Sequence, residues 1–454
     1  MPHSPIVHDL RSAHSADALL TGAPLPTLLY FALPIILGNI FQQLYSIVDA
    51  IVVGNFLGDL PLSGISVASP IVDVANALVI GGTIGVGVLC AHYCGAGEGE
   101  RLRCMNATAL LGGGALTLLI ALCGIFFSTP LLRAQGTEEA VCREAAVYLQ
   151  LVFAGLLFCF LYNYYAAMLR SCGNSRTPFL ILLLSSTLHA LLDVLFVGVF
   201  GWGIRGVAFS TVLCQALAAA ACILYAQRRC PPLLLRPANL RFDRQMARLV
   251  LSYAWAAALQ QAVVCIGRLL VQGMLTPLGT STVTGYNMSL RTEQFLFCFS
   301  QGISAAMVVC LSQNLGHGDR PRARRFFRIS VLVELALIAL LGTVCFLFPA
   351  RIVGLFSDNA DVIAAGAQYT GAMAYLYVFA YLGEVIQGFF RGLGRLRLTM
   401  VASLLQVLLR VVLSYLLIPV WGMYGICAAV VSGWVLLVGI EGAYAVRKSS
   451  ALAA

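Results

Sequence analysis

One carboxylate, Asp49, lies in the apolar sequence YSIVDAIVVG, near the end of a long apolar segment. An ionisable group in such surroundings is costly to bury and usually has a function. A second acid, Asp193, also lies near the end of an apolar segment, and His189 precedes it by one helical turn. Two nearby carboxylates are difficult to ionise together, and imidazole can accept or relay a proton. These residues favour a proton carrier; the alternative is a set of core polar groups that hydrogen-bond between helices.

The elements that must position these residues are long apolar segments. Of the 454 residues, 60% are hydrophobic and 10% are charged, whereas soluble domains carry about 25% charged residues. The alternating pattern of short β-barrel strands is absent, so we predict an all-α integral membrane protein. At about 20 apolar residues per crossing, the sequence predicts twelve transmembrane helices, at 28–53, 61–91, 104–128, 143–168, 177–200, 204–227, 247–275, 282–312, 326–349, 361–390, 397–419 and 423–446.

Basic residues gather on one side of these predicted helices. Of the 28 Lys and Arg residues, 21 fall on one side, four fall on the other, and Arg268, Arg291 and Arg410 fall within the helices. The positive-inside rule places the first side, with both termini, in the cytoplasm. The net charge of +9 is therefore a sign of topology, and we predict no nucleic-acid partner.

The chain also repeats itself, at a numbering offset of 221 or, for some pairs, 219. Each half holds six helices, so the repeat is parallel, as in many transporters. We predict a cytoplasmic N-terminal segment at 1–27, an N-lobe of helices 1–6 at 28–227, a cytoplasmic linker at 228–246, a C-lobe of helices 7–12 at 247–446 and a cytoplasmic tail at 447–454. The recurring pairs include Gly58 and Gly279, Gly64 and Gly285, Gly95 and Gly316, Gly97 and Gly318, Gly173 and Gly394, Gly203 and Gly422, and Gly206 and Gly425.

Two lobes leave a cleft between them, and rocking of the lobes would open it to each side in turn. Asp49 and Asp193 both belong to the N-lobe. We expect their segments to run in opposite directions and the two acids to share one level of the membrane, towards the outside.

Other polar residues occupy related positions in the two halves. The dipeptides Gln42-Gln43 and Gln260-Gln261 could face the cleft and hydrogen-bond a ligand, or could pack helices. Asp73 and Glu293, which fall one position apart under the offset, could line the cleft and meet a cationic substrate. Glu293 could instead pair with Arg291. Three further acids within the helices are expected to be mainly structural: Glu334, Glu384 and Glu441.

No constellation for catalysis or metal binding is evident. The chain has 15 cysteines but no CxxC spacing, and we predict no disulfide framework. Cys90, His92 and Cys94 lack a fourth ligand, so we interpret them as core residues. Signatures of metalloproteases, serine hydrolases and phosphate-binding loops are absent. We therefore predict no enzyme activity, no metal site and no cofactor.

The order of several motifs resembles the multidrug and toxic compound extrusion (MATE) family, in particular its bacterial DNA-damage-inducible and multidrug branch. The similarity extends from about residue 25 to residue 445. It is carried by LYSIVDAIVVGNFLGDLPLSG (44–64), LRSCGNSRTPF (169–179), LSQNLGHGDRPRARR (311–325), FFRGLGRLR (389–397) and two GxxG turns at Gly203 and Gly422. The resemblance implies two six-helix lobes and drug efflux by antiport against protons or sodium ions.

The resemblance also implies roles for individual residues. One branch of the family uses an Asp in helix 1, an Asn-x-x-x-Asp in helix 5 and a Thr in helix 6, which match Asp49, Asp193 and Thr211 here. His189 occupies the position of the Asn. Imidazole is a poor ligand for a hard cation such as sodium, so this departure favours proton coupling. A second branch uses acids in helices 7 and 10, whereas helix 7 here offers only glutamines and Arg268 at that depth.

The sequence thus predicts a secondary active multidrug exporter that moves amphipathic, cationic small molecules out of the cell against inward protons. We expect it to be a monomer in the bacterial cytoplasmic (inner) membrane, in contact with the lipid bilayer. The alternatives are a sodium-coupled antiporter of the same fold, a flippase for lipid-linked precursors from the same superfamily, and a membrane receptor or scaffold.

Overall fold

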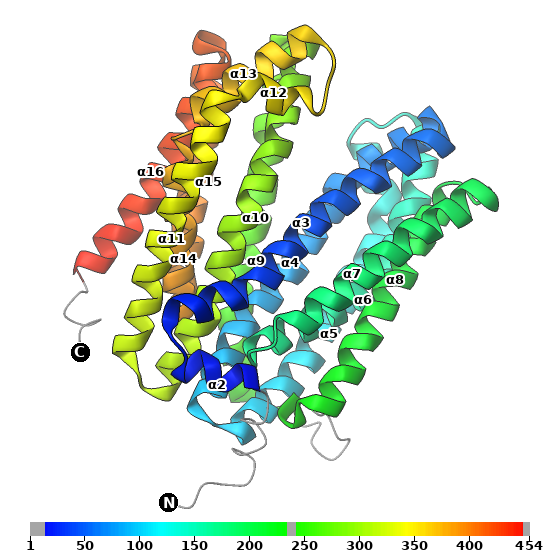
Figure 1. Cartoon of the computed structure of the whole chain (residues 1–454). Helices are drawn as coiled ribbons and strands as arrows, with labels where there is room; N and C mark the ends of the chain where they lie inside the picture. Colours follow the sequence, from blue (N-terminus) through cyan, green and yellow to red (C-terminus); the bar gives the residue numbers. More distant parts are fainter. Residues whose placement is uncertain (1–13, 234–241, 448–454) are drawn as a thin grey trace, which may run out of the picture. The chain divides into compact units, whose positions relative to one another are not determined.

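The computed structural model describes residues 14–233 and 242–447, and every regular element within these ranges is a helix (Figure 1). Parts of the predicted N-terminal segment, linker and tail therefore lie outside the described residues. The elements are α2 (His14–Thr21), α3 (Pro24–Leu57), α4 (Asp59–Ala96), α5 (Gly99–Ala134), α6 (Glu139–Ser171), α7 (Arg176–Asp193), the π-helix η1 (Val194–Val199), α8 (Ile204–Arg229), the 3-10 helix η2 (Pro231–Leu233), α9 (Arg244–Gly273), the 3-10 helix η4 (Thr276–Leu278), α10 (Thr280–His317), α11 (Arg320–Leu347), α12 (Pro349–Gly354), α13 (Ala360–Met373), α14 (Tyr377–Gly392), α15 (Leu396–Trp421) and α16 (Met423–Arg447).

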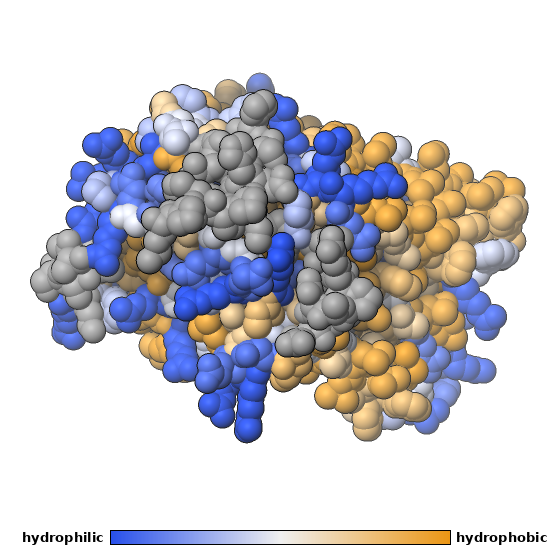
Figure 2. Space-filling view, turned by 90° about the horizontal axis from the view of Figure 1, so that it is seen from below, coloured by the Kyte–Doolittle hydropathy of each residue, from blue (hydrophilic) through white to orange (hydrophobic). Residues whose placement is uncertain are grey.

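These helices confirm the predicted membrane spans. Among the described residues, eleven stretches are long and apolar enough to cross a membrane. The pair α13 and α14, bent by 57°, brings the number to twelve when it is counted as one span. Large apolar side chains point outward from them; Phe126 and Phe127 of α5 are 74% and 63% exposed. Such a surface is unfavourable in water and suits hydrocarbon. Seen from below, hydrophilic residues gather on part of the surface and hydrophobic residues cover an adjoining part (Figure 2).

The contacts divide the chain into two compact units. Unit 1 comprises residues 1–22, 37–262 and 312–318, and unit 2 comprises residues 23–36, 263–311 and 319–454. In unit 1, α4, α5, α6 and α8 enclose a core that includes Met105, Leu149 and Tyr164. The Tyr164 hydroxyl donates to Asn106 Oδ1 at 2.8 Å, and Asn106 Nδ2 donates to the Leu233 carbonyl at 3.1 Å. Buried polar atoms in this core are thus paired.

The core of unit 2 is rich in tyrosine. Tyr286, Tyr369, Tyr377 and Tyr381 are nearly or fully buried among apolar residues of α10, α14 and α16. The Tyr286 and Tyr369 rings meet edge to face, with their centroids 5.1 Å apart. A buried tyrosine needs a partner for its hydroxyl, and Tyr381 donates to the Leu296 carbonyl at 2.7 Å.

Glycines at matching positions make the same contacts in the two halves, which supports the internal repeat. A Cβ on Gly64 would lie 3.0 Å from Glu144 Cβ, and in the equivalent pair of the second half a Cβ on Gly285 would lie 2.9 Å from Ala365 Cβ. Within unit 1, Gly95 packs against the Gln313 carbonyl while Gly316 packs against the His92 carbonyl, so the contact is reciprocal. Each glycine permits backbones to approach where a side chain would clash.

The change of offset from 221 to 219 has a structural cause. A Cβ on Gly206 would meet Phe196 and Val197, and a Cβ on Gly425 would meet Leu417 and Ile418. Gly206 and Gly425 are therefore related by the offset of 219. The residues that they contact are related by the offset of 221, because Phe196 corresponds to Leu417 and Val197 to Ile418. Two additional residues lie between Val197 and Gly203 in the first half, where the chain forms the π-helix η1 instead of continuing as α-helix. Such π segments occur most often at functional sites.

Candidate functional site

Asp193 is the last residue of α7, immediately before η1, and it is fully buried. In η1 the Phe200 amide donates to the Leu195 carbonyl at 2.9 Å, five residues back. The ring of Phe196, in η1, stacks on the ring of Trp202, just after η1, with the centroids 4.8 Å apart. The Asp193 carboxylate has left water, so its polar neighbours decide its charge.

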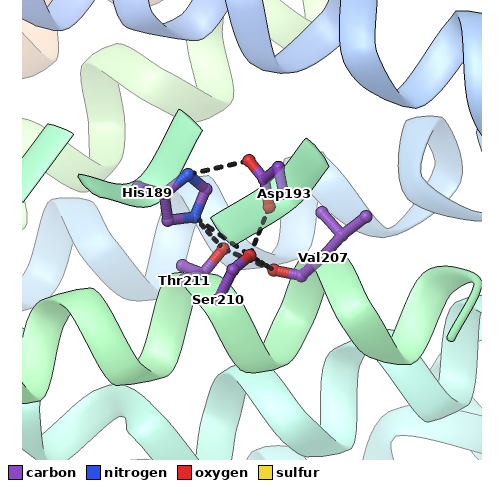
Figure 3. A network of polar contacts seen from close by, with 5 residues as sticks. All are labelled: His189, Asp193, Val207, Ser210 and Thr211. Carbon is purple, nitrogen blue, oxygen red and sulfur yellow. Dashed lines mark hydrogen bonds and ion pairs between the residues drawn. The ribbon is translucent and has the colours of Figure 1, made fainter. Parts of the chain in front are cut away.

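Four side chains from α7 and α8 form one polar network around this carboxylate (Figure 3). His189 Nδ1 lies 2.9 Å from Asp193 Oδ2, and the two side chains are 5% and 0% exposed. The Ser210 hydroxyl donates to Asp193 Oδ1 in a short hydrogen bond. On the other edge of the ring, His189 Nε2 lies 2.9 Å from Thr211 Oγ1 and 3.5 Å from Ser210 Oγ. The ring therefore bridges the carboxylate to two hydroxyl groups.

The geometry accommodates two protonation states of the His189–Asp193 pair. With one proton on the pair, the neutral ring can carry it on Nδ1, 2.9 Å from Asp193 Oδ2, and Nε2 can then accept from the Thr211 hydroxyl. In this arrangement Asp193 Oδ2 accepts no hydrogen bond from the described residues. With two protons, both ring nitrogens donate, because imidazolium has no acceptor. Thr211 Oγ1 can then accept from Nε2–H while it donates to the Val207 carbonyl, 2.8 Å away. The pair can gain or lose one proton without a large movement, and its charge changes between −1 and 0.

The start of α8 explains how its hydroxyl groups reach α7. Gly201 and Gly203 have φ angles of +64° and +61°, in the left-handed region that favours glycine, and they make the turn between η1 and α8. Gly206 brings α8 against η1, since a Cβ there would lie 3.2 Å from Phe196 Cβ. One turn later, Ser210 faces Asp193. Sequence reasoning identified Thr211 through the family resemblance but missed Ser210. The sequence feature that could have indicated Ser210 is its hydroxyl group, directly before Thr211 on the same segment.

Helix α3 runs beside α7 and η1 in the same direction. A Cβ on Gly38 would lie 3.5 Å from Leu182 Cδ2, and a Cβ on Gly198 would lie 3.0 Å from Phe56 Cε1. The expectation of opposite directions is wrong, because successive spans alternate in direction and the first and fifth spans therefore run the same way. From these contacts, position 49 of the α3 backbone falls level with about position 192 of α7. The side chain of Asp49 lies outside the described residues, so its role stays a prediction.

The other residues predicted from the sequence lie elsewhere in the two units. In unit 1, Gln42, Asp73 and Gln261 are exposed, Gln43 is partly exposed and Gln260 is buried. Their role in a substrate cavity stays a prediction.

Glu293 belongs to unit 2, where it is buried among tyrosines. It accepts hydrogen bonds from the Tyr369 and Tyr377 hydroxyls at 3.4 and 3.3 Å. Arg291, its alternative partner from the sequence, is exposed. Nearby, Arg410 Nη2 donates to the Tyr286 hydroxyl at 3.5 Å. The carboxylate is thus held by neutral donors inside the unit.

The remaining acids of unit 2 differ from one another. Glu384 pairs with Arg391 at 3.1 Å. Glu334 and Glu441 are fully buried; Glu334 lies within hydrogen-bonding reach of Ser300, and the Glu441 carboxylate has no hydrogen-bond partner in the part of the chain that the structure describes. Sequence reasoning treated both as packing groups.

Both halves of the chain match the model of a known protein family. A family model described as MatE matches the chain twice, over residues 34–195 and 256–416. The two matches are displaced from each other by nearly the same offset as the glycine pairs, in agreement with the repeat.

The chain is 27% identical over 387 residues to the "Probable multidrug resistance protein YpnP" of Bacillus subtilis, covering 85% of this chain and 86% of that protein. It is 26% identical over 355 residues to a protein of Shewanella oneidensis named "FAD transporter", covering 76% of this chain and 77% of that protein. Among solved structures, a MOP superfamily transporter from Pyrococcus furiosus matches with a TM-score of 0.87 at 18% identity, over the full length of both chains. That protein is described as having a binding pocket of reversed polarity, which suggests a different function for it.

Proposed function

The chain belongs to the MatE family of multidrug efflux transporters, and on this premise we propose that it exports small molecules against an inward flow of protons carried by the His189–Asp193 pair. The pair is buried, it can hold one or two protons, and it follows the rule that ionisable groups inside membrane proteins mark ion pathways. This buried pair is the observation that carries the proposal.

The second half of the repeat supports a functional role for the pair. At the offset of 221, His189 corresponds to Arg410 and Asp193 to Ser414; at 219, Ser210 and Thr211 correspond to Ala429 and Val430. Both halves fold with the same helix pairing and the same GxxG turn. The fold therefore does not require the acid, the imidazole or the two hydroxyls at these positions.

Charge explains how the proton and the substrate would compete. When the pair carries one proton its charge is −1, and it attracts a cationic substrate. At an effective dielectric constant of about 20, two unit charges about 6 Å apart attract by roughly 3 kcal/mol. A second proton removes this attraction, so a proton that enters from outside would release the substrate there. Asp49, at the same level on α3, would act with the pair.

Alternating access supplies the rest of the cycle. We propose that the two lobes rock about the site that contains the pair, as parallel repeats of transporters do. A proton bound from outside shifts the equilibrium only because the two states bind it with different affinity. The protein would work as a monomer in the cytoplasmic membrane, with both termini in the cytoplasm.

Transport in proteoliposomes tests this proposal. Ethidium, a permanent monovalent cation, is the substrate, and a pH gradient and a sodium gradient are imposed separately. Efflux driven by the pH gradient alone supports proton coupling. Efflux driven by the sodium gradient alone contradicts it and favours the sodium-coupled alternative. No ethidium transport under either gradient would contradict multidrug export.

A second candidate substrate class comes from the relative named as an FAD transporter. FAD is an anionic dinucleotide, and Arg268 and Arg410 lie near the buried Glu293 in unit 2. Replacing ethidium with FAD in the same vesicles separates the two classes. Uptake of FAD without uptake of ethidium would assign the protein to dinucleotide transport.

A further inference from the structure

Three cysteines converge at one end of unit 1, away from the His189–Asp193 pair. Cys90 and Cys94 lie one turn apart on α4, and Cys172 caps the end of α6. The three sulfur atoms lie within 4.8 Å of one another, and Cys94 Sγ and Cys172 Sγ are 3.3 Å apart. Cys90 is buried, whereas Cys94 and Cys172 are partly exposed. The cluster is therefore compact.

The backbone around the cluster is held by contacts that do not involve sulfur. Ser171 Oγ donates to the Gly87 carbonyl of α4 at 2.8 Å, and Gln313 Nε2 donates to the Ser171 carbonyl at 2.6 Å. Gly87 permits this approach, because a Cβ there would lie 3.2 Å from Ser171 Oγ. After Cys172, Gly173 turns the chain with a φ of +91°. The α6 terminus is thus fixed against α4, and the three thiols are held together before any ligand binds.

A fourth cysteine lies close by. Cys230, just beyond the end of α8, interacts electrostatically with all three thiols.

We propose that Cys90, Cys94 and Cys172 bind a thiophilic d¹⁰ cation such as Zn²⁺ or Cd²⁺, with Cys230 or water as the fourth ligand. Soft thiolate ligands select such metals. Metal–sulfur bonds of about 2.3 Å place tetrahedral sulfur ligands roughly 3.8 Å apart, which fits the spacing of the cluster. Each bound thiol releases one proton and forms one metal–sulfur bond, and no electron is transferred. The cation would cross-link α4 to α6.

The sequence alone could not show this site. In the sequence, Cys90, His92 and Cys94 lack a fourth ligand, and in the structure His92 is exposed and lies outside the cluster. The third ligand, Cys172, is 78 residues from Cys94 and joins it only through the packing of α4 and α6.

Titration of the reduced, full-length protein in detergent with Cd²⁺ tests the site, with thiolate-to-cadmium charge-transfer absorption as the signal. We expect saturation at one equivalent, and a loss of affinity of at least tenfold in both Cys94→Ser and Cys172→Ser. Cys123, an exposed cysteine of α5, gives the matched control Cys123→Ser, which should bind like the parent. Unchanged affinity in Cys172→Ser, or no charge-transfer band in the parent, would overturn the proposal.

Protection from alkylation provides a second measurement on the parent protein, which does not depend on the folding of a variant. Bound Cd²⁺ should slow maleimide labelling of Cys94 and Cys172, read by mass spectrometry, and leave Cys123 unaffected. Equal protection of Cys123 would indicate non-specific binding and refute the site. Loss of Cys94 and Cys172 thiols as a pair, with no metal bound, would instead identify a disulfide-forming pair and also refute it.

Discussion

Replacing Asp193 with Asn should abolish the response of transport to a pH gradient. The amide keeps the size of the side chain but removes the charge that faces His189 Nδ1 at 2.9 Å. Protonating the imidazole would then leave a buried cation without its anion, and breaking a buried ion pair in this way costs about 3–5 kcal/mol. A gradient of two pH units supplies about 2.7 kcal/mol per proton. A change of two pH units therefore favours protonation by less than this cost. The imidazole of the variant stays neutral, and no proton is carried.

The pH gradient also sets the expected accumulation ratio of ethidium. With one proton exchanged for one monovalent cation, a two-unit gradient supports an accumulation ratio of about 100 in the parent. The exchange is electroneutral, so clamping the membrane potential should not change this ratio. In Asp193→Asn we expect a ratio near one.

The assay is ethidium accumulation in proteoliposomes at equal protein content. Glu100→Gln is the matched control, because Glu100 is 80% exposed and pairs with Arg103 at the surface; it should reach the parent's ratio. If Asp193→Asn also reached a ratio of about 100, the pair would not carry the proton and the reasoning would fail.

Three further substitutions follow from the same geometry. His189→Asn restores the Asn-x-x-x-Asp pattern of the family, and we expect a sodium gradient to drive efflux in this variant but not in the parent. Ser210→Ala removes the donor to Asp193 Oδ1. It should lower pH-driven efflux about tenfold, because a hydrogen bond to a charged group is worth about 1.5 kcal/mol. Unchanged efflux would show that Ser210 has no role in proton coupling. Gly206→Ala places a Cβ 3.2 Å from Phe196 Cβ and should cost about 1–3 kcal/mol, seen as a lower melting temperature than Gly82→Ala, where nothing lies within 4 Å.

Much of the fold could be predicted from the sequence because apolar length and the positions of Gly and Arg report directly on membrane crossings. Each predicted span has its helix, and the glycine pairs make matching contacts. The break between Met373 and Tyr377 could not be predicted, because neither Pro nor Gly lies within it and a long apolar stretch looks continuous.

The site was only partly accessible from the sequence. His189 and Asp193 share a helical face, so their contact follows from spacing alone. Ser210 reaches Asp193 because η1 and the turn at Gly201 and Gly203 determine which residues of α8 lie beside which residues of α7. The same limit applies to Cys172, since packing between distant helices has no signal in local spacing.

A final prediction separates function from stability at the His189–Asp193 pair. Replacing both residues with Leu removes the buried charges together, and such replacements are often neutral or stabilising by about 1–4 kcal/mol. Ser210 and Thr211 would keep a partner, because each hydroxyl can donate to the Val207 carbonyl, 2.8 Å away, in the absence of the pair. We therefore expect His189→Leu with Asp193→Leu to melt no lower than the parent yet show no pH-driven efflux.

The single variant His189→Leu provides the comparison. It leaves the Asp193 carboxylate fully buried beside an apolar side chain, with Ser210 as its remaining donor. This variant should be less stable than the double variant by about 3–5 kcal/mol. Thermal unfolding in detergent measures the order of the three proteins. If the double variant melted well below the parent, the pair would be needed to hold α7 against α8, and its burial would no longer favour a role in proton transport.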